Sequence, residues 1–319
     1  MTRTTRTPLP EAQVDLSVTL GSATFANPIT TASGCFASGA EIDRSFDIRD
    51  LGAVVVKSVT PEPREGLPTP RMTETPSGML NAIGLQNPGI DAWLARDLPF
   101  LRERGARVIL SIAGKSVEEF ALLASRVSQT RGIDAVEVNL SCPNVAHRGL
   151  VFACSTGPSA DVIRAVRSHL PRMPIMAKLT PDVTDITAIG RAVIEAGATG
   201  ISAINTTLGM AIDADTGRPK IANTFGGLSG PAIRPIAVRA VHQLHTALGP
   251  EVPIIGMGGV RTVEDTVEMI RAGASMVAIG TATFADPFAS HRLVGGLRRW
   301  MADRGHASLQ DLRGRVTPW

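Results

Sequence analysis

The sequence predicts an α/β protein: a (β/α)8 TIM barrel with long inserted loops at the carboxyl ends of its strands. Eight short β-branched runs recur along the chain, and amphipathic segments of helical period lie between most of them. Near-continuous apolar strands that alternate with helices are typical of a parallel sheet covered by helices. Eight such units in about 250 residues favour a closed barrel. A doubly wound open sheet is the alternative, but no Gly-x-Gly-x-x-Gly follows the first run, which argues against its dinucleotide-binding version.

The predicted strands share a β-branched core and a polar or glycine-rich end; they are residues 27–33, 53–59, 107–113, 135–140, 174–179, 200–205, 253–258 and 276–281. Helical period is clearest in residues 117–128 and 186–198. Two connections, 60–99 and 206–230, are too long for simple loops, and long structured loops at barrel strand ends usually build or cover a site. Within the second, residues 210–219 read as a hairpin that turns at Asp-Thr-Gly.

Composition limits the function classes. The 319 residues, 44% of them hydrophobic, suit one domain at 14–305 between a loose tail at 1–13 and a second tail at 306–319. The net charge of +3 comes from scattered arginines, so we expect no nucleic acid partner. The three cysteines lack the spacing of a metal site, and no apolar run approaches the ~20 residues of a membrane span. We expect a reduced, cytoplasmic protein without a signal peptide or a bound metal.

The hexapeptide 139–144, Asn-Leu-Ser-Cys-Pro-Asn, ends the fourth predicted strand and places the Cys142 thiol between two asparagines. Buried without partners, such polar groups would each cost roughly 1–3 kcal/mol. At the mouth of a barrel they could instead meet a polar ligand. The alternative is an inert cysteine beside a Pro-Asn turn, but the flanking amides of Asn139 and Asn144 favour a functional thiol.

Two lysines, Lys57 and Lys178, lie near the ends of the second and fifth predicted strands. A lysine within an apolar strand is costly unless its ammonium group meets an anion or a hydrogen-bond acceptor. Because both strand ends lie at the same end of a barrel, the pair indicates an anionic or electron-rich ligand. The alternative is that each lysine forms an internal ion pair with a glutamate such as Glu137.

Two glycine-rich segments close the last two strands: Gly258 and Gly259 after the seventh, and Gly280 with Thr281 after the eighth. Glycines let backbone N–H groups approach a phosphate, and phosphate binding after strands seven and eight recurs in barrel enzymes. Tight turns without a ligand are the alternative.

Six motifs in order carry a family resemblance: NAIGLQNPG (81–89), NLSCPN (139–144), INT (204–206), GGLSGPAI (226–233), IIGMGGV (254–260) and AIGTATFADP (278–287). The chain resembles class 1 dihydroorotate dehydrogenases over roughly residues 14 to 300, and most of all the catalytic subunit of the B type. The resemblance implies a (β/α)8 barrel that binds FMN at its carboxyl face and oxidises dihydroorotate to orotate in pyrimidine (UMP) synthesis. It also implies a homodimer or a heterotetramer.

The resemblance also implies residue roles. Cys142 would be the catalytic base that takes a proton from C5 of dihydroorotate while hydride passes from C6 to the flavin, and Lys57 would lie between substrate and flavin. The substrate-binding residues would be Lys57, Asn81, Ala82, Ile83, Gly84, Leu85, Asn139, Asn144, Asn205 and Thr206. FMN would be held by Ser33, Lys57, Ser58, Ser111, Asn139, Lys178, Ile204, Gly230, Gly258, Gly259, Gly280 and Thr281, with Lys178 stabilising the reduced isoalloxazine. Ser111 departs from the family, which often has Asn there, and Cys154 is a second candidate thiol.

Two other functions remain open at this point. Another FMN-barrel oxidoreductase acting on a dihydropyrimidine or dihydrouridine would also use a cysteine, and a non-catalytic flavin-binding subunit could keep the fold. The electron acceptor is open as well. A-type relatives use fumarate, whereas B-type relatives reach NAD through a partner with FAD and a [2Fe-2S] cluster. Such a cluster needs four ligands, so it would belong to another chain.

Overall fold

The computed structural model describes residues 6–140 and 154–317. Within these ranges, eight parallel strands form one sheet in the order β3-β14-β13-β10-β9-β8-β7-β4. The sheet closes because Thr30 and Ala53, at its two edges, form a parallel bridge. The (β/α)8 barrel is therefore confirmed, and the open sheet is excluded. The strands are β3 (Ile29–Thr31), β4 (Val54–Val55), β7 (Val108–Ile112), β8 (Ala135–Asn139), β9 (Ile175–Leu179), β10 (Gly200–Ala203), β13 (Ile254–Met257) and β14 (Met276–Ile279).

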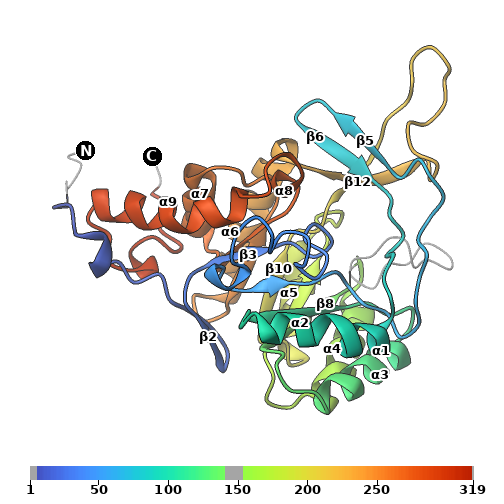
Figure 1. The fold of residues 1–319 in the computed structure, drawn as a ribbon, viewed down its shortest axis with the longest axis horizontal. Coiled ribbons are helices and arrows are strands. Elements are labelled where there is room, and N and C mark those ends of the chain that lie inside the picture. Colours follow the sequence, from blue (N-terminus) through green and yellow to red (C-terminus); the bar gives the residue numbers. More distant parts are fainter. Residues whose placement is uncertain (1–5, 141–153, 318–319) are drawn as a thin grey trace.

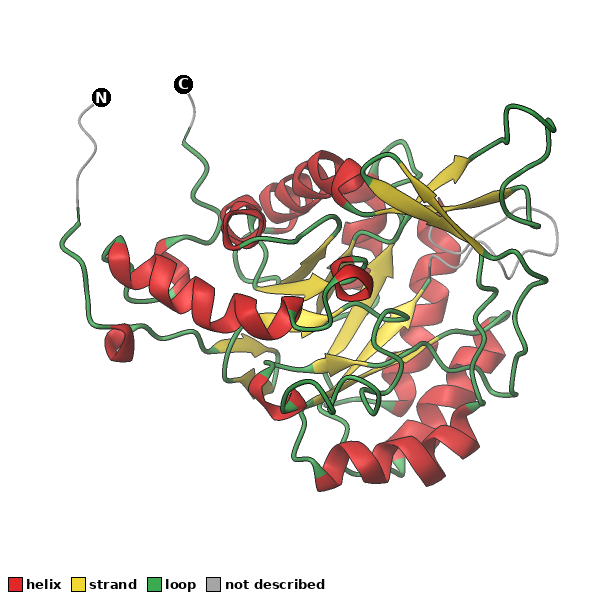
Figure 2. Ribbon diagram, turned by 45° about the horizontal axis from the view of Figure 1, so that its top comes forward, coloured by secondary structure: helices red, strands yellow, loops and turns green. Residues whose placement is uncertain are grey.

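Helices surround this barrel (Figures 1 and 2). They are α1 (Ile90–Ala92), a π-helical turn (Trp93–Asp97), α2 (Leu98–Glu103), α3 (Val117–Ser128), α4 (Thr156–His169), α5 (Ile186–Glu195), α6 (Arg234–Leu248), α7 (Val263–Ala272), α8 (Ala282–Ala285) and α9 (Ala289–Asp303). Their apolar faces pack on the strands, as in α3, where Phe120, Leu123, Ala124 and Val127 are buried. Side-chain caps fix several helix starts. The Asp185 carboxylate, for example, accepts hydrogen bonds from the backbone N–H groups of Thr187 and Ala188 at the start of α5.

The two long connections meet in space. The first contains β5 (Met72–Thr75) and β6 (Gly78–Asn81), and the second contains β11 (Thr207–Met210) and β12 (Phe225–Ser229). Together they form an antiparallel sheet in the order β11-β12-β6-β5, which projects at the upper right of Figures 1 and 2. The hairpin predicted at 210–219 is present as an antiparallel bridge between Ile212 and Pro219. Segments more than a hundred residues apart thus make one wall.

The remaining elements are a short hairpin and several 3-10 helices. The strands β1 (Val18–Leu20) and β2 (Ala23–Phe25) form an antiparallel hairpin, and short 3-10 helices occur at Glu11–Gln13, Ile48–Asp50, Pro231–Ile233 and Leu309–Asp311. The last of these buries Leu309, and Leu312 follows it into the main hydrophobic core. No helix among the described residues is long and apolar enough to cross a bilayer.

The barrel interior changes character along the strands. Alternate residues of a strand point to the same side, and the inward residues near the amino ends are apolar. Ile109, Ala135, Met176, Ile255 and Met276 pack there with Leu20 and Phe25 of the β1–β2 hairpin. Two residues further along, the inward positions become polar: Ser111, Glu137, Lys178 and Ser202 are all buried. The polar layer marks the end of the barrel at which a ligand can be held.

Candidate functional site

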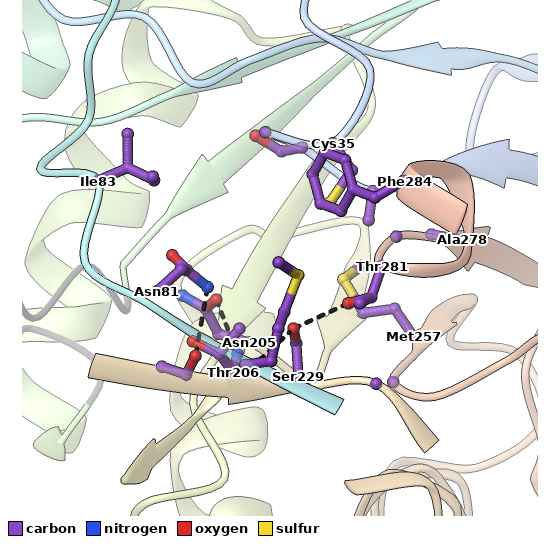
Figure 3. A pocket seen from close by; sticks show the side chains of 18 of the residues that line it. Cys35, Asn81, Ile83, Asn205, Thr206, Ser229, Met257, Ala278, Thr281 and Phe284 are labelled. Carbon is purple, nitrogen blue, oxygen red and sulfur yellow. Dashed lines mark hydrogen bonds between the residues drawn. The ribbon is translucent and has the colours of Figure 1, made fainter. Parts of the chain in front are cut away.

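A cavity of about 610 Å³ lies at the carboxyl ends of the barrel strands (Figure 3). Its floor comes from the barrel, and one wall is the antiparallel sheet, which contributes Met72, Met79, Asn81, Gly227 and Ser229. Most of the predicted site residues line it: Ser33, Lys57, Ser58, Asn81, Ile83, Gly84, Leu85, Asn139, Lys178, Ile204, Asn205, Thr206, Gly230, Gly258, Gly259, Gly280 and Thr281. A cavity of this size is ordinary for a cofactor or a drug-sized ligand.

An irregularity in the second barrel strand places Lys57 and Ser58. The Val56 N–H donates to Ile109 O at 3.2 Å, and the Val59 N–H donates to Ser111 O at 2.9 Å. Two residues of the neighbouring strand therefore face three residues here, which is the arrangement of a β-bulge. Bulges often lie beside active sites, where they redirect side chains. Lys57 lines the cavity as a result, and its Nζ would lie 3.3 Å from a Cβ added to Gly34.

Lys178 both lines the cavity and contacts Glu137. Its Nζ lies 3.5 Å from Glu137 Oε1, and the two side chains are 5% and 0% exposed. The alternative of an internal ion pair therefore applies to Lys178, and it coexists with a position on the cavity floor. The parallel register explains the geometry, because Lys178 on β9 is aligned with Asn139 on β8, two residues beyond Glu137.

Three asparagines reach the cavity from three elements. Asn139 ends β8, and its Nδ2 donates to Ser58 Oγ at 3.2 Å. Asn81 ends β6, and its Nδ2 donates to Gly227 O across the antiparallel sheet at 3.2 Å. Asn205 follows β10, and its Oδ1 accepts from the Thr206 N–H at 2.9 Å (Figure 3). Amide groups oriented by fixed hydrogen bonds suit a planar ligand that carries both donors and acceptors.

The glycine-rich turns also line the cavity and meet there. Gly230, Gly258 and Gly259 adopt φ values of +96°, +133° and +71°, which favour glycine. A Cβ on Gly259 would lie 2.7 Å from Gly230 O, so the two turns touch through their backbones. Nearby, Thr281 Oγ1 donates to Ser229 Oγ at 2.8 Å (Figure 3). Since the glycines have no side chains, the backbone itself forms this part of the wall.

Two of the predicted site residues that the structure describes, Ser111 and Ala82, do not line the cavity. Ser111 lies beneath Ser58, with the two Oγ atoms 2.8 Å apart. Ala82 packs in a small apolar cluster with Leu80 and Ile221, because alternation along the chain turns it away from the cavity that Asn81 and Ile83 face. Cys142 and Asn144 lie outside the described residues, as does the loop residue His147.

Sequence reasoning gave no role to several residues that line the cavity, among them Cys35, Ser229, Met257 and Phe284 (Figure 3). Ser229 could have been found, since it lies within the motif at 226–233. Burial raises the pKa of the Cys35 thiol, and the positive charges of Lys178 and Lys57 oppose that rise. Cys154 is exposed, and its pKa is also raised, by partial desolvation and by the negative charge of Asp182. Among the described residues, no cluster of His, Cys, Asp and Glu is arranged to hold a metal ion.

Comparison with known proteins identifies the family. A family model described as dihydroorotate dehydrogenase matches residues 15–301. The chain belongs to the dihydroorotate dehydrogenase family. Membership confirms the resemblance carried by the six motifs and the expected oxidoreductase class.

Curated members of the dihydroorotate dehydrogenase family match nearly the whole chain. A relative from Desulforamulus reducens is 46% identical over 302 residues, which cover 95% of this chain and 98% of the relative. Relatives from Listeria innocua and Geobacillus kaustophilus are also 46% identical, over 93% and 94% of this chain and 97% and 95% of their own lengths. All three are named dihydroorotate dehydrogenase B (NAD(+)), catalytic subunit.

Proposed function

We propose that this chain oxidises dihydroorotate to orotate in UMP biosynthesis, with FMN as the hydride acceptor and Cys142 as the base. One observation carries the proposal. A single cavity brings together two lysines, three asparagines and two glycine-rich turns from separate parts of the chain. Family membership supplies the reaction, and the cavity supplies groups of the right chemistry to perform it.

The residues present fit FMN. The turns at Gly258–Gly259 and Gly280–Thr281 give a backbone-lined end suited to one terminal phosphate, with the hydroxyls of Thr281 and Ser229 beside it. Lys178 would lie at the ring end, where a cation stabilises negative charge on a reduced isoalloxazine. Ser33, Ser58 and Asn139 are joined by hydrogen bonds and would hold the same end.

The asparagines suit the substrate. Dihydroorotate presents ring N–H and C=O groups together with a carboxylate, so Asn81, Asn139 and Asn205 can pair with the ring, and Lys57 can meet the negative charge. Asn144 and Thr206 would complete these contacts. When bound, FMN would supply the acceptor for the hydride leaving C6. The task left to the protein is removal of the C5 proton, which we assign to Cys142.

Electrons must then leave the site, and we propose that a separate subunit receives them. The relatives are named as catalytic subunits of NAD(+) enzymes. The three cysteines of this chain cannot hold a [2Fe-2S] cluster, which needs four ligands. A partner carrying FAD and a [2Fe-2S] cluster would connect FMN to NAD within a heterotetramer of two chains of each kind. The alternative assembly, a homodimer of this chain, would have no such partner.

Cofactor analysis and substrate reduction test the proposal together. The purified chain should be yellow and release FMN, not FAD, and anaerobic dihydroorotate should bleach the bound flavin. Dihydrouracil, which lacks the carboxylate, is the matched control and should bleach it far more slowly. Faster reduction by dihydrouracil or dihydrouridine would instead assign a different dihydropyrimidine oxidoreductase. A flavin that neither compound reduces would indicate a non-catalytic flavin-binding subunit, and a folded chain unable to take up FMN would refute the cofactor.

A further inference from the structure

Glu137 is a fully buried carboxylate to which the proposed reaction gives no role. It lies in the middle of β8 with 0% exposure, and it points into the barrel interior beside Ser111 of β7, with which it is aligned. Its Oε1 accepts a hydrogen bond from Ser111 Oγ at 3.1 Å and contacts Lys178 Nζ at 3.5 Å. Its Oε2 is buried and has no hydrogen-bond partner among the described residues.

A buried carboxylate of this kind destabilises the folded state unless it is compensated. Burying a carboxylate costs several kcal/mol unless a cation and hydrogen bonds compensate, and replacing a buried ion pair by apolar residues is often neutral or stabilising. Packing therefore gives no reason for a charge at this position. The half-satisfied carboxylate is better explained by its effect on Lys178, the cation it contacts.

The arrangement orients the charge pair. Lys178 lines the cavity, whereas Glu137 does not, so the ammonium group lies at the floor and the carboxylate lies behind it. The carboxylate also ends a chain of hydroxyls. Ser33 Oγ lies 3.0 Å from Ser58 Oγ, which lies 2.8 Å from Ser111 Oγ. The network thus joins Glu137 to the residues on the cavity floor.

We propose that Glu137 is a positioning residue that fixes the ammonium group of Lys178 at the cavity floor and sets the net charge beneath the flavin. The inference rests on the proposed function, because it assumes that the ring of FMN lies over Lys178. A paired lysine stabilises an anionic reduced flavin less than an unpaired lysine would, since the carboxylate offsets part of its field. Glu137 would therefore hold the flavin potential below the value that Lys178 alone would give.

Two variants separate charge from packing. Glu137→Gln removes the charge but keeps the length of the side chain and an oxygen that can accept from Lys178. It should favour reduced over oxidised FMN at least tenfold, which is about +30 mV for a two-electron couple. Glu137→Asp keeps the charge and should stay within about threefold of the parent. Glu251→Gln, an exposed change just before β13, is the control and should have no effect. Spectroelectrochemical titration of the FMN-loaded protein measures all three.

An unchanged or lowered potential in Glu137→Gln would overturn the inference, and so would an equal shift in Glu137→Asp, which would indicate packing. The double variant Lys178→Ala, Glu137→Gln gives a second test, which can be measured even where the single variant Glu137→Gln does not fold. Lys178→Ala should lower the potential, and adding Glu137→Gln should then change it much less than in the parent chain, because a carboxylate that acts by positioning Lys178 has no ammonium group left to position. A full-sized shift in the Lys178→Ala background would show that Glu137 does not act through Lys178. Failure of the chain to bind FMN, or of dihydroorotate to reduce it, would refute the proposed function instead.

Discussion

Gly259→Ala should damage both the fold and the cofactor site, and a second glycine gives its control. Gly259 has φ +71°, and an added Cβ would lie 2.7 Å from Gly230 O and 2.8 Å from Arg234 Cβ. Gly217, in the exposed hairpin, has nearly the same φ of +68°, but an added Cβ there would have no atom within 4 Å. The two alanine variants therefore share the backbone strain and differ only in the collision.

The expected losses of stability follow from the backbone strain and from the collision. A left-handed backbone costs a residue with a Cβ about 1–2 kcal/mol, so Gly217→Ala should lose that much stability. Gly259→Ala should lose a further 1–3 kcal/mol or so, the usual cost of forcing atoms into a packed site. Because Gly230 and Gly259 both line the cavity, relief of the collision would move the proposed phosphate-binding wall. The affinity for FMN should fall, because binding would require the relaxed wall to return to its parental position, and the loss should be at most roughly 150-fold, the ratio that corresponds to about 3 kcal/mol.

Urea denaturation of the apo-protein measures the stability term, and quenching of FMN fluorescence on binding measures the affinity. Gly217→Ala should bind FMN like the parent chain. Equal losses of stability in the two variants, together with an unchanged affinity for FMN in Gly259→Ala, would refute the argument that the touching turns shape the phosphate end.

Three further predictions concern the reaction. Cys142→Ala should bind FMN but slow flavin reduction by dihydroorotate by about 10²–10⁴-fold at neutral pH in stopped flow. Cys142→Ser should keep some activity that rises with pH, and Cys154→Ala should change the rate of flavin reduction only slightly. Reduction of Cys142→Ala at the parental rate would place the base elsewhere. Lys57→Ala should weaken orotate binding and slow flavin reduction, whereas the exposed Lys115→Ala should alter neither, and equal behaviour of the two would remove Lys57 from the site. The isolated chain should turn over dihydroorotate with a dye but not with NAD in steady-state assays; efficient NAD reduction would contradict the need for a partner, and rapid turnover with fumarate would indicate an A-type enzyme.

Much of the site could be predicted because its residues lie at strand ends. Parallel strands bring their carboxyl ends to one face, so Lys57, Asn139, Lys178 and Asn205 had to converge once eight strand–helix units were recognised. Side-chain directions that change from one residue to the next were harder to predict. Ala82 lies between two residues that line the cavity, yet it faces the opposite way because side chains alternate along an extended segment.

The sequence by itself determined the fold class, the family and the end of the barrel at which the chemistry lies. Hydrophobic periodicity and the order of motifs can both be read along the sequence, without any knowledge of contacts between distant residues. Only the tertiary structure decided which partner each polar group found. Lys178 could have faced a ligand or paired with a glutamate, and the parallel register of β8 and β9 makes it do both. The antiparallel sheet over the cavity likewise depends on pairing between β6 and β12, which are separated by more than a hundred residues. Such pairing is set by the closure of the whole barrel, which no local pattern encodes.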